Sequence, residues 1–124
     1  MLLRREFSFD AAHKLVQYHG KCENLHGHTY RMSVEISGHP DDEGMITDFV
    51  KVKETVEAEV LSKFDHSYLN DIIAQPSAEN IARYVFERLD PLLSGPNYSL
   101  NAVRIWESPH SSVIFSRDDL KSGT

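Results

Sequence analysis

A cysteine and a pair of histidines near the start of the sequence have a spacing suited to binding a metal ion. Cys22 precedes His26 and His28, and both histidines occupy alternate positions of a run that reads as a β-strand. Because successive side chains of a strand point to opposite faces, the two imidazoles fall on one side, about 6 to 7 Å apart along the strand. Two nitrogens in this arrangement can bind one metal ion.

A third histidine, His13, ends a second alternating run whose apolar positions are Phe7, Phe9 and Ala11. Antiparallel pairing of the two runs would bring His13 alongside the histidine pair. Three neutral imidazoles leave one position of a tetrahedral zinc ion open, which is typical of catalytic rather than structural zinc. The sequence therefore favours a metal site in which one coordination position is free.

The alternative is that these are ordinary strand histidines, since a His-x-His pair alone is weak evidence for a metal. The nearby cysteine and the third histidine on an apolar strand face favour the metal. Cys22 itself has three interpretations: a fourth ligand that closes the site, a free thiolate beside it, or a buried, inert thiol.

Composition limits the class of protein. The chain has 124 residues, 40% of them hydrophobic, and no segment approaches the roughly 20 apolar residues of a membrane span, so we expect a single domain over 1–124 with no membrane partner. A formal charge of −6 argues against general nucleic-acid binding. The first residues lack the apolar stretch of a signal peptide, and one cysteine suits a reducing, cytoplasmic location.

Periodicity predicts the elements that must position these residues. Alternation predicts strands over residues 2–13, 26–37, 100–106 and 111–116, and residues 45–47 read as a further short strand. Apolar residues at three- and four-residue spacing predict two helices. The first begins at the N-cap Asp48 and runs to about Lys63; the second begins at the N-cap Ser77 and is ended or bent by Pro91. Residues 117–124 read as a polar tail.

This ββααββ order predicts an α+β fold in which two helices pack on one face of an antiparallel sheet. The second strand spans roughly 11 residues, well beyond the usual 5 or 6, so an open sheet would leave long unpaired edges. Edge pairing between subunits, closing a β-barrel, would cover these edges. We therefore expect an oligomer.

Three further residues could take part in chemistry. Asp65 and His66 follow the end of the first helix, and a carboxylate beside an imidazole can fix its tautomer and raise its basicity. The alternative is a histidine facing a helix C-terminus beside an incidental aspartate. Glu107 ends a strand, where a carboxylate is either solvated or accepts two hydrogen bonds from a guanidine-like ligand edge.

Taken together, these motifs resemble the 6-pyruvoyltetrahydropterin synthase and 6-carboxytetrahydropterin synthase family, which has the tunnelling fold. The resemblance covers nearly the whole chain. Its motifs are Phe7-Ser8-Phe9-Asp10-Ala11-Ala12-His13, Cys22 with His26-Gly27-His28, Gly44-Met45-Ile46-Thr47-Asp48-Phe49, Asp65-His66, Pro76-Ser77-Ala78-Glu79-Asn80, and Glu107. The resemblance also implies a homohexamer made of two trimeric barrels, with active sites at subunit interfaces.

The resemblance implies a role for each candidate residue. His13, His26 and His28 would be Zn²⁺ ligands, Cys22 the catalytic base, Asp65 and His66 the rest of the proton-transfer set, and Glu107 the anchor of the pterin ring. The three residues between Cys22 and His26 resemble the bacterial carboxytetrahydropterin branch. That enzyme is a lyase that converts 7,8-dihydroneopterin triphosphate to 6-carboxy-5,6,7,8-tetrahydropterin, acetaldehyde and triphosphate on the route to queuosine.

Two alternative functions remain open at this point. One is 6-pyruvoyltetrahydropterin synthase, a triphosphate lyase of the same family that keeps the three-carbon side chain. The other is a non-catalytic zinc-binding module in which Cys22 is the fourth ligand.

Overall fold

The computed structural model describes residues 1–16 and 24–121. Its main layer is a curved sheet in which β1 (Leu2–His13), β2 (His26–Gly38), β5 (Tyr98–Ser108) and β6 (Ser111–Ser116) are antiparallel neighbours in that order. Two short strands, β3 (Ser67–Tyr68) and β4 (Ser94–Gly95), pair with β1 and β5. The four long strands predicted from alternation are confirmed, and the third is longer than predicted at both ends.

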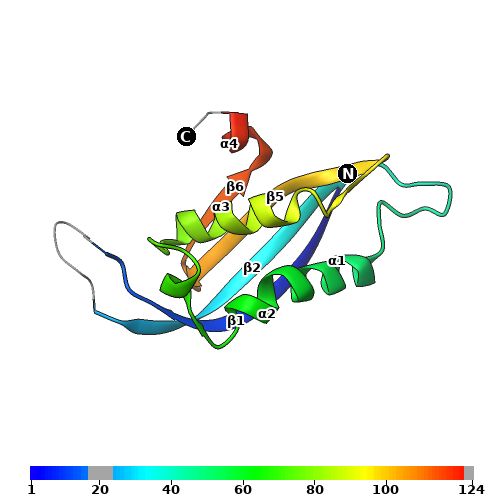
Figure 1. Ribbon diagram of the computed structural model, residues 1–124. Helices are drawn as coiled ribbons and strands as arrows, with labels where there is room; N and C mark the ends of the chain where they lie inside the picture. Colours follow the sequence, from blue (N-terminus) through cyan, green and yellow to red (C-terminus); the bar gives the residue numbers. More distant parts are fainter. Residues whose placement is uncertain (17–23, 122–124) are drawn as a thin grey trace.

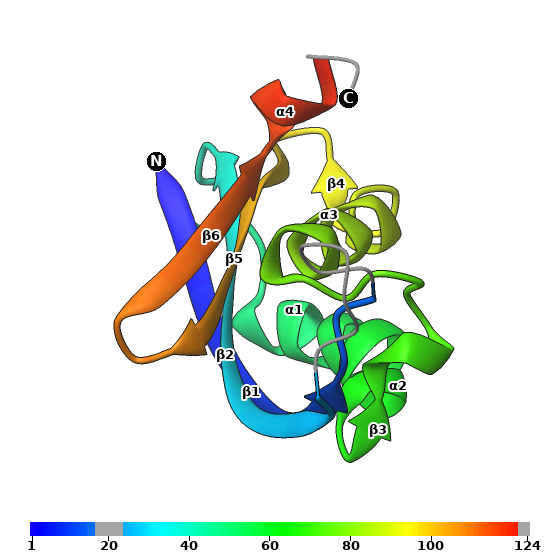
Figure 2. The ribbon, with the colours of Figure 1, turned by 90° about the vertical axis from the view of Figure 1, so that its left-hand side faces the viewer.

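The helices form the second layer and lie on one face of the sheet, as predicted (Figures 1 and 2). The first is α1 (Phe49–Val56), which continues through a π-helical turn (Glu57–Leu61) into α2 (Ser62–Phe64). The second is α3 (Ala78–Leu89). A 3₁₀ turn (Leu69–Asp71) lies between them, and no helix among the described residues is long and apolar enough to span a membrane.

Both predicted N-caps are confirmed. The Asp48 carboxylate accepts a hydrogen bond from the Val50 N–H at 2.8 Å, and the Ser77 hydroxyl accepts one from the Asn80 N–H at 3.2 Å. These caps fix where each helix begins. For α3 the consequence is functional, because its N-cap follows Pro76 directly and so places the Pro76 carbonyl group.

Two local expectations differ from the structure. Residues 45–47 are not a strand, because the Asp41 side chain accepts the N–H groups of Glu43 and Met45 and so holds this segment in turns. The expected polar tail begins instead with a short helix, α4 (Arg117–Lys121). Its start is stabilised by the Asp119 carboxylate, which accepts bonds from the N–H and hydroxyl of Ser116.

The core lies between the sheet and the helices. β2 contributes its alternate residues, and the helices contribute their apolar stripes. The fully buried members are Tyr30, Met32, Val34 and Ile36 from β2, Val52, Val56 and Val60 from the first helix, and Ile81, Val85 and Leu89 from α3. The same alternation extends back to the first residue of β2, so His26 and His28 lie on the face of the core residues.

Candidate metal centre

Three histidines and one glutamate converge where β1, β2 and β5 lie side by side. The Nε2 atoms of His13 and His26 are 3.2 Å apart, and one Glu107 carboxylate oxygen is 3.3 Å from Nε2 of His28 and 3.8 Å from Nε2 of His13. One ligand atom from each of the four residues lies within 4.8 Å of all the others. The residues therefore surround a space of the size that one metal ion occupies.

Strand register brings these side chains together. β1 pairs antiparallel with β2 so that His13 lies opposite His26, and Ala11 lies opposite His28. This confirms that pairing of the two alternating runs brings the third histidine to the pair. On the other side of β2, Arg31 pairs with Trp106, which places Glu107 at the same end of the sheet.

Backbone carbonyl groups fix the orientation of two of the imidazoles. Nδ1 of His13 is 2.8 Å from the Pro76 carbonyl oxygen, and Nδ1 of His26 is 2.9 Å from the Asn24 carbonyl oxygen. A carbonyl oxygen only accepts hydrogen bonds, so each Nδ1 carries the hydrogen and donates it. In the neutral rings each Nε2 then presents a lone pair toward the centre of the cluster.

These lone pairs are the observation that fits a metal. Two neutral Nε2 atoms at 3.2 Å cannot bond to each other, and their lone pairs repel unless a cation lies between them. His13 is 1% exposed, so water does not relieve this repulsion on its side. A divalent ion would satisfy both nitrogens, and the carbonyl partners are the kind of outer contacts that hold metal-binding histidines.

A second group of ligand-type side chains joins β1 to the turn that follows α2. Asp65 and His66 are paired as expected, with His66 Nδ1 3.2 Å from an Asp65 carboxylate oxygen, and Asp10 joins them. The Asp10 N–H donates to the other Asp65 oxygen at 2.9 Å, and the Asp10 carbonyl accepts from the His66 N–H at 2.6 Å. The Asp10 carboxylate in turn accepts the Thr29 hydroxyl at 2.6 Å.

His66 also has an unusual backbone. Its φ is 59°, in the left-handed region that costs a non-glycine residue roughly 1 to 2 kcal/mol. The bond from its N–H to Asp10 holds this conformation and directs the imidazole back to Asp65. Strain of this kind is common at functional sites.

The ligand atoms form two distinct clusters among the described residues, although one hollow of about 560 Å³ is lined by His28 from the first and by Asp10 and His66 from the second. Asp10 and Thr29 alternate with His13 and His28 along β1 and β2, so their side chains point to the opposite face of the sheet. The structure therefore joins Glu107 to the three histidines and leaves Asp65 and His66 apart from them. Cys22, the expected catalytic base, lies outside the described residues.

A hollow of about 540 Å³ adjoins Glu107 and His28. That volume is within the roughly 300 to 1,000 Å³ of small-molecule pockets. Its walls include Arg31 and Trp106, and the Arg31 guanidinium carbon lies 3.9 Å from the centroid of the Trp106 ring. An aromatic surface, a cation and a carboxylate therefore meet beside the candidate metal centre.

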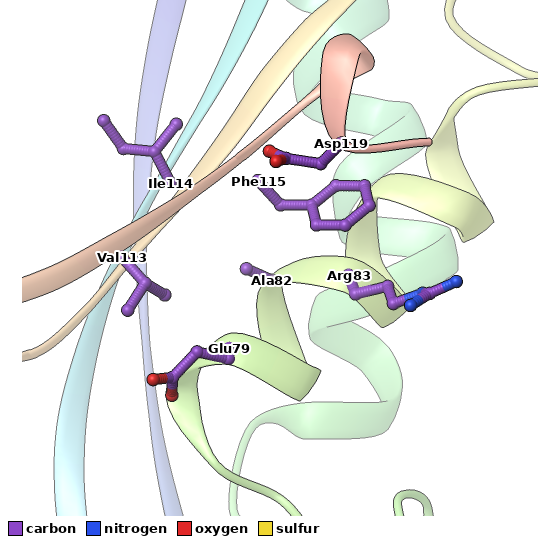
Figure 3. Close-up of a pocket in the computed structure, with 7 residues that line it drawn as sticks. All are labelled: Glu79, Ala82, Arg83, Val113, Ile114, Phe115 and Asp119. Atoms are coloured by element: carbon purple, nitrogen blue, oxygen red, sulfur yellow. The ribbon is translucent and has the colours of Figure 1, made fainter. Parts of the chain in front are cut away.

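A different hollow of about 320 Å³ lies between α3 and β6 (Figure 3). It is lined by Glu79, Ala82 and Arg83 from α3, by Val113, Ile114 and Phe115 from β6, and by Asp119 from α4. None of the candidate site residues lines it. This hollow is a feature of the sheet edge and is not part of the candidate metal centre.

Sequence reasoning missed three parts of these two groups. It predicted that Glu107 binds the ring of a ligand but not that it lies among the histidines. It gave Asp10 no role, and it could not identify the Pro76 carbonyl as a partner of His13. A signal existed for Asp10 alone, since it lies in the same motif as His13. The other two depend on contacts between distant parts of the chain.

Comparison with known proteins gives a consistent result. The chain matches the family model of 6-pyruvoyl tetrahydropterin synthase over residues 2–118. It is 35% identical to a 6-carboxy-5,6,7,8-tetrahydropterin synthase of Haemophilus influenzae, over 88% of this chain and 94% of the relative. It is 38% identical to a dihydroneopterin monophosphate aldolase of Pyrococcus furiosus, over 86% and 89%.

Among solved structures, the chain resembles the 6-pyruvoyl tetrahydropterin synthase of Caenorhabditis elegans. The two superpose with a TM-score of 0.81 at 31% sequence identity, and the match covers 94% of each chain. Sequence and fold therefore agree over the same extent of chain.

Proposed function

The chain belongs to the 6-pyruvoyl tetrahydropterin synthase family and has its tunnelling fold, and from this premise we propose that it is a zinc-dependent 6-carboxy-5,6,7,8-tetrahydropterin synthase. In this proposal it is a cytoplasmic lyase that converts 7,8-dihydroneopterin triphosphate to 6-carboxytetrahydropterin, acetaldehyde and triphosphate in queuosine biosynthesis. The proposal rests above all on the convergence of the His13 and His26 Nε2 atoms to 3.2 Å beside a hollow of about 540 Å³.

The proposed ligands are His13, His26 and His28, whose ligand atoms lie within 4.8 Å of one another, and the proposed metal is zinc because imidazole nitrogens suit it. When bound, the ion would acidify hydroxyl groups of the substrate side chain and polarise a developing carbonyl. The chain's own contribution is to hold the imidazoles. The Pro76 and Asn24 carbonyl groups accept hydrogen bonds from Nδ1 of His13 and His26, so that Nε2 of each neutral ring is the atom directed to the metal.

The remaining candidates are assigned to binding and proton transfer. Glu107 would accept the N–H groups along the guanidine-like edge of the pterin and hold the ring in the adjoining hollow. Cys22 as a thiolate would remove a carbon-bound proton. His66 would return protons, with Asp65 fixing its tautomer through the contact at 3.2 Å.

Because Asp65 and His66 cluster with Asp10 and not with the three histidines of their own subunit, we propose that they complete the site of a neighbouring subunit. The sheet supports such an assembly. Within residues 1–16 and 24–121, β3 covers the outer edge of β1 at Ala11 and Ala12 alone, and β6 pairs with β5 only. Two different free edges favour head-to-tail pairing that closes into a ring. The proposed assembly is a homohexamer of two trimeric barrels.

Product analysis tests the proposed reaction. Zinc-loaded protein is incubated with 7,8-dihydroneopterin triphosphate, and the products are identified by mass spectrometry. We expect 6-carboxytetrahydropterin with equal amounts of acetaldehyde and triphosphate. A product that keeps the three-carbon side chain would instead identify a 6-pyruvoyltetrahydropterin synthase.

A second candidate activity follows from the Pyrococcus furiosus relative, which is named as an aldolase acting on the monophosphate. The same assay with 7,8-dihydroneopterin monophosphate tests it. An aldolase would cleave a carbon–carbon bond of this compound without releasing inorganic phosphate. Faster turnover of the monophosphate than of the triphosphate would overturn the proposed substrate.

The Cys22→Ala variant tests the non-catalytic alternative. If Cys22 is the catalytic base, the variant keeps its zinc and loses turnover by on the order of 10²- to 10⁴-fold. If Cys22 is a structural fourth ligand, the variant loses zinc and stability together. Metal analysis and thermal melting of the same sample separate the two results.

A further inference from the structure

The Glu107 carboxylate lies where a fourth metal ligand belongs. In a tetrahedral site with metal–ligand bonds of about 2.0 to 2.2 Å, neighbouring ligand atoms are about 3.3 to 3.6 Å apart. The observed separations are 3.2 Å between His13 and His26, 3.3 Å between His28 and Glu107, and 3.8 Å between His13 and Glu107. The Glu107 carboxylate therefore lies where a fourth ligand would join the three imidazoles.

We infer that Glu107 is the fourth metal ligand of the substrate-free enzyme and that it exchanges the metal for the pterin ring when substrate binds. This inference rests on the proposed function, which assigns binding of the pterin ring to the same carboxylate. The sequence favoured a metal with one open coordination position; in this inference Glu107 occupies that position until substrate binds. The exchange needs no covalent step, because one oxygen donor replaces another.

Charge favours this arrangement. Three neutral imidazoles do not offset the double charge of a divalent ion. The site is also shielded from water at His13, which is 1% exposed. An anionic ligand offsets part of that charge, and Glu107 is the acidic member of the cluster. At His13, whose Nδ1 donates to the Pro76 carbonyl, the neutral ring turns its Nε2 lone pair toward the Glu107 carboxylate at 3.8 Å, and the two would repel unless a cation lay between them.

Position favours the exchange. Glu107 lines the hollow that also contains Arg31 and Trp106, so its carboxylate stands between the histidines and the proposed ring site. Its side chain is 35% exposed and has three rotatable bonds, which leaves it room to turn from one to the other. When the edge of the pterin ring binds the Glu107 carboxylate, the side chain of the substrate would occupy the coordination position that Glu107 leaves.

Metal binding by the full-length protein tests this inference without reference to turnover. Zinc affinity is measured by competition with a chelator for wild type, Glu107→Gln and Glu6→Gln, the last being the same chemical change on β1 away from the cluster. We expect Glu107→Gln to lower the affinity by about 10- to 100-fold, as loss of a metal-site partner does. Glu6→Gln should match the wild type.

Cobalt-loaded samples report the ligands directly through their visible spectra. We expect the substrate-free spectrum of Glu107→Gln to differ from that of the wild type. Addition of 7,8-dihydroneopterin, which carries the ring and side-chain hydroxyls without phosphate, should change the wild-type spectrum as Glu107 leaves the metal. Circular dichroism confirms that each variant is folded.

Three results would overturn the inference. The first is equal zinc affinity and an equal substrate-free spectrum for wild type and Glu107→Gln; if that variant also fails to bind dihydroneopterin, Glu107 serves the ring alone and the proposed function stands. The second is a thiolate charge-transfer band that Cys22→Ala removes, which would identify the sulfur as the fourth ligand. The third is a wild-type spectrum that dihydroneopterin leaves unchanged.

The experiments can refute the proposed function and the inference about Glu107 independently. If Glu107→Gln changes metal affinity and spectrum while the wild type leaves dihydroneopterin triphosphate unconverted, Glu107 is a ligand of a metal site with another activity. Metal binding and product formation are measured on the same preparations, so the two failures are distinguishable.

Discussion

Two groups of ligand-type side chains lie beside β1 and β2, and they differ in how they are held. The group of His13, His26, His28 and Glu107 is partly buried, and backbone carbonyls fix two of its rings. The group of Asp10, Asp65 and His66 is exposed and is held by its own mutual bonds. Both have their ligand atoms within 4.8 Å of one another.

Burial and tautomer decide which group suits a metal. In the first, the Nε2 atoms of His13 and His26 lie 3.2 Å apart while both Nδ1 atoms donate to backbone carbonyls. In the second, the carboxylates are engaged by Thr29, by a backbone N–H and by His66. An exposed acidic group is also stabilised by water at little cost. Proximity of ligand atoms alone is therefore not evidence of a metal site, and the second group is better suited to proton transfer.

The largest expected effect is on metal content. His28→Ala leaves two histidines, so we expect the purified protein to lose its stoichiometric zinc and all measurable turnover. His66→Ala is the matched control from the other group and should keep a full complement of zinc. Metal analysis by mass spectrometry checks both. A fully loaded His28→Ala protein would contradict the ligand assignment.

The next effect is on catalysis in the second group. We expect His66→Ala to lower kcat by on the order of 10²- to 10⁴-fold with unchanged metal content, because a positioned acid–base group is lost. Wild-type kcat in this variant would remove His66 from the mechanism.

Mixed oligomers sharpen this prediction. His28→Ala and His66→Ala subunits are unfolded together and refolded as a mixture with zinc. If the two groups serve sites shared between subunits, some sites in the mixture receive an intact copy of each, so activity returns. A mixture as inactive as its components, despite refolding to the wild-type oligomer, would show that each site takes both groups from one subunit.

A smaller effect is on stability. Zinc at 100 times its dissociation constant should raise the free energy of unfolding of the wild type by about 2.7 kcal/mol, which corresponds to several degrees in Tm. His66→Ala should respond equally, and His28→Ala should not respond. Thermal melts with and without a chelator measure the difference. An equal response of all three proteins would place the stabilising zinc elsewhere.

The sequence predicted the three histidines of the first group and the pairing of Asp65 with His66 in the second, but it did not predict that Glu107 joins the histidines or that Asp10 joins the pair. His13, His26 and His28 lie on strands whose alternation is visible locally, and antiparallel pairing of neighbouring strands is the simplest topology. Glu107 joins them through pairing of β2 with β5, which are about 70 residues apart along the chain. No local pattern encodes that contact.

The same reasoning explains Asp10. Its contact with Asp65 spans 55 residues and exists because the turn after α2 packs against the edge of β1. Helices, by contrast, were predicted to within a few residues, since caps and apolar stripes are local signals. The error at residues 45–47 also has a local cause, because side-chain bonds from Asp41 outweighed the apolar pattern of the segment.

The smallest expected effect tests whether the two groups are independent. Thr29 lies next to His28 on β2, and its hydroxyl donates to the Asp10 carboxylate at 2.6 Å on the opposite face. Thr29→Val keeps the β-branched shape and removes this bond, so we expect the free energy of unfolding to fall by about 0.5 to 1.5 kcal/mol. Thr29→Ser keeps the hydroxyl and is the control. Urea unfolding measures the stability, and chelator competition should give the wild-type zinc affinity for both variants. If Thr29→Val instead weakened zinc binding, the two faces of β2 would be coupled through the strand itself, and the Asp10 group would have to be counted as part of the metal site.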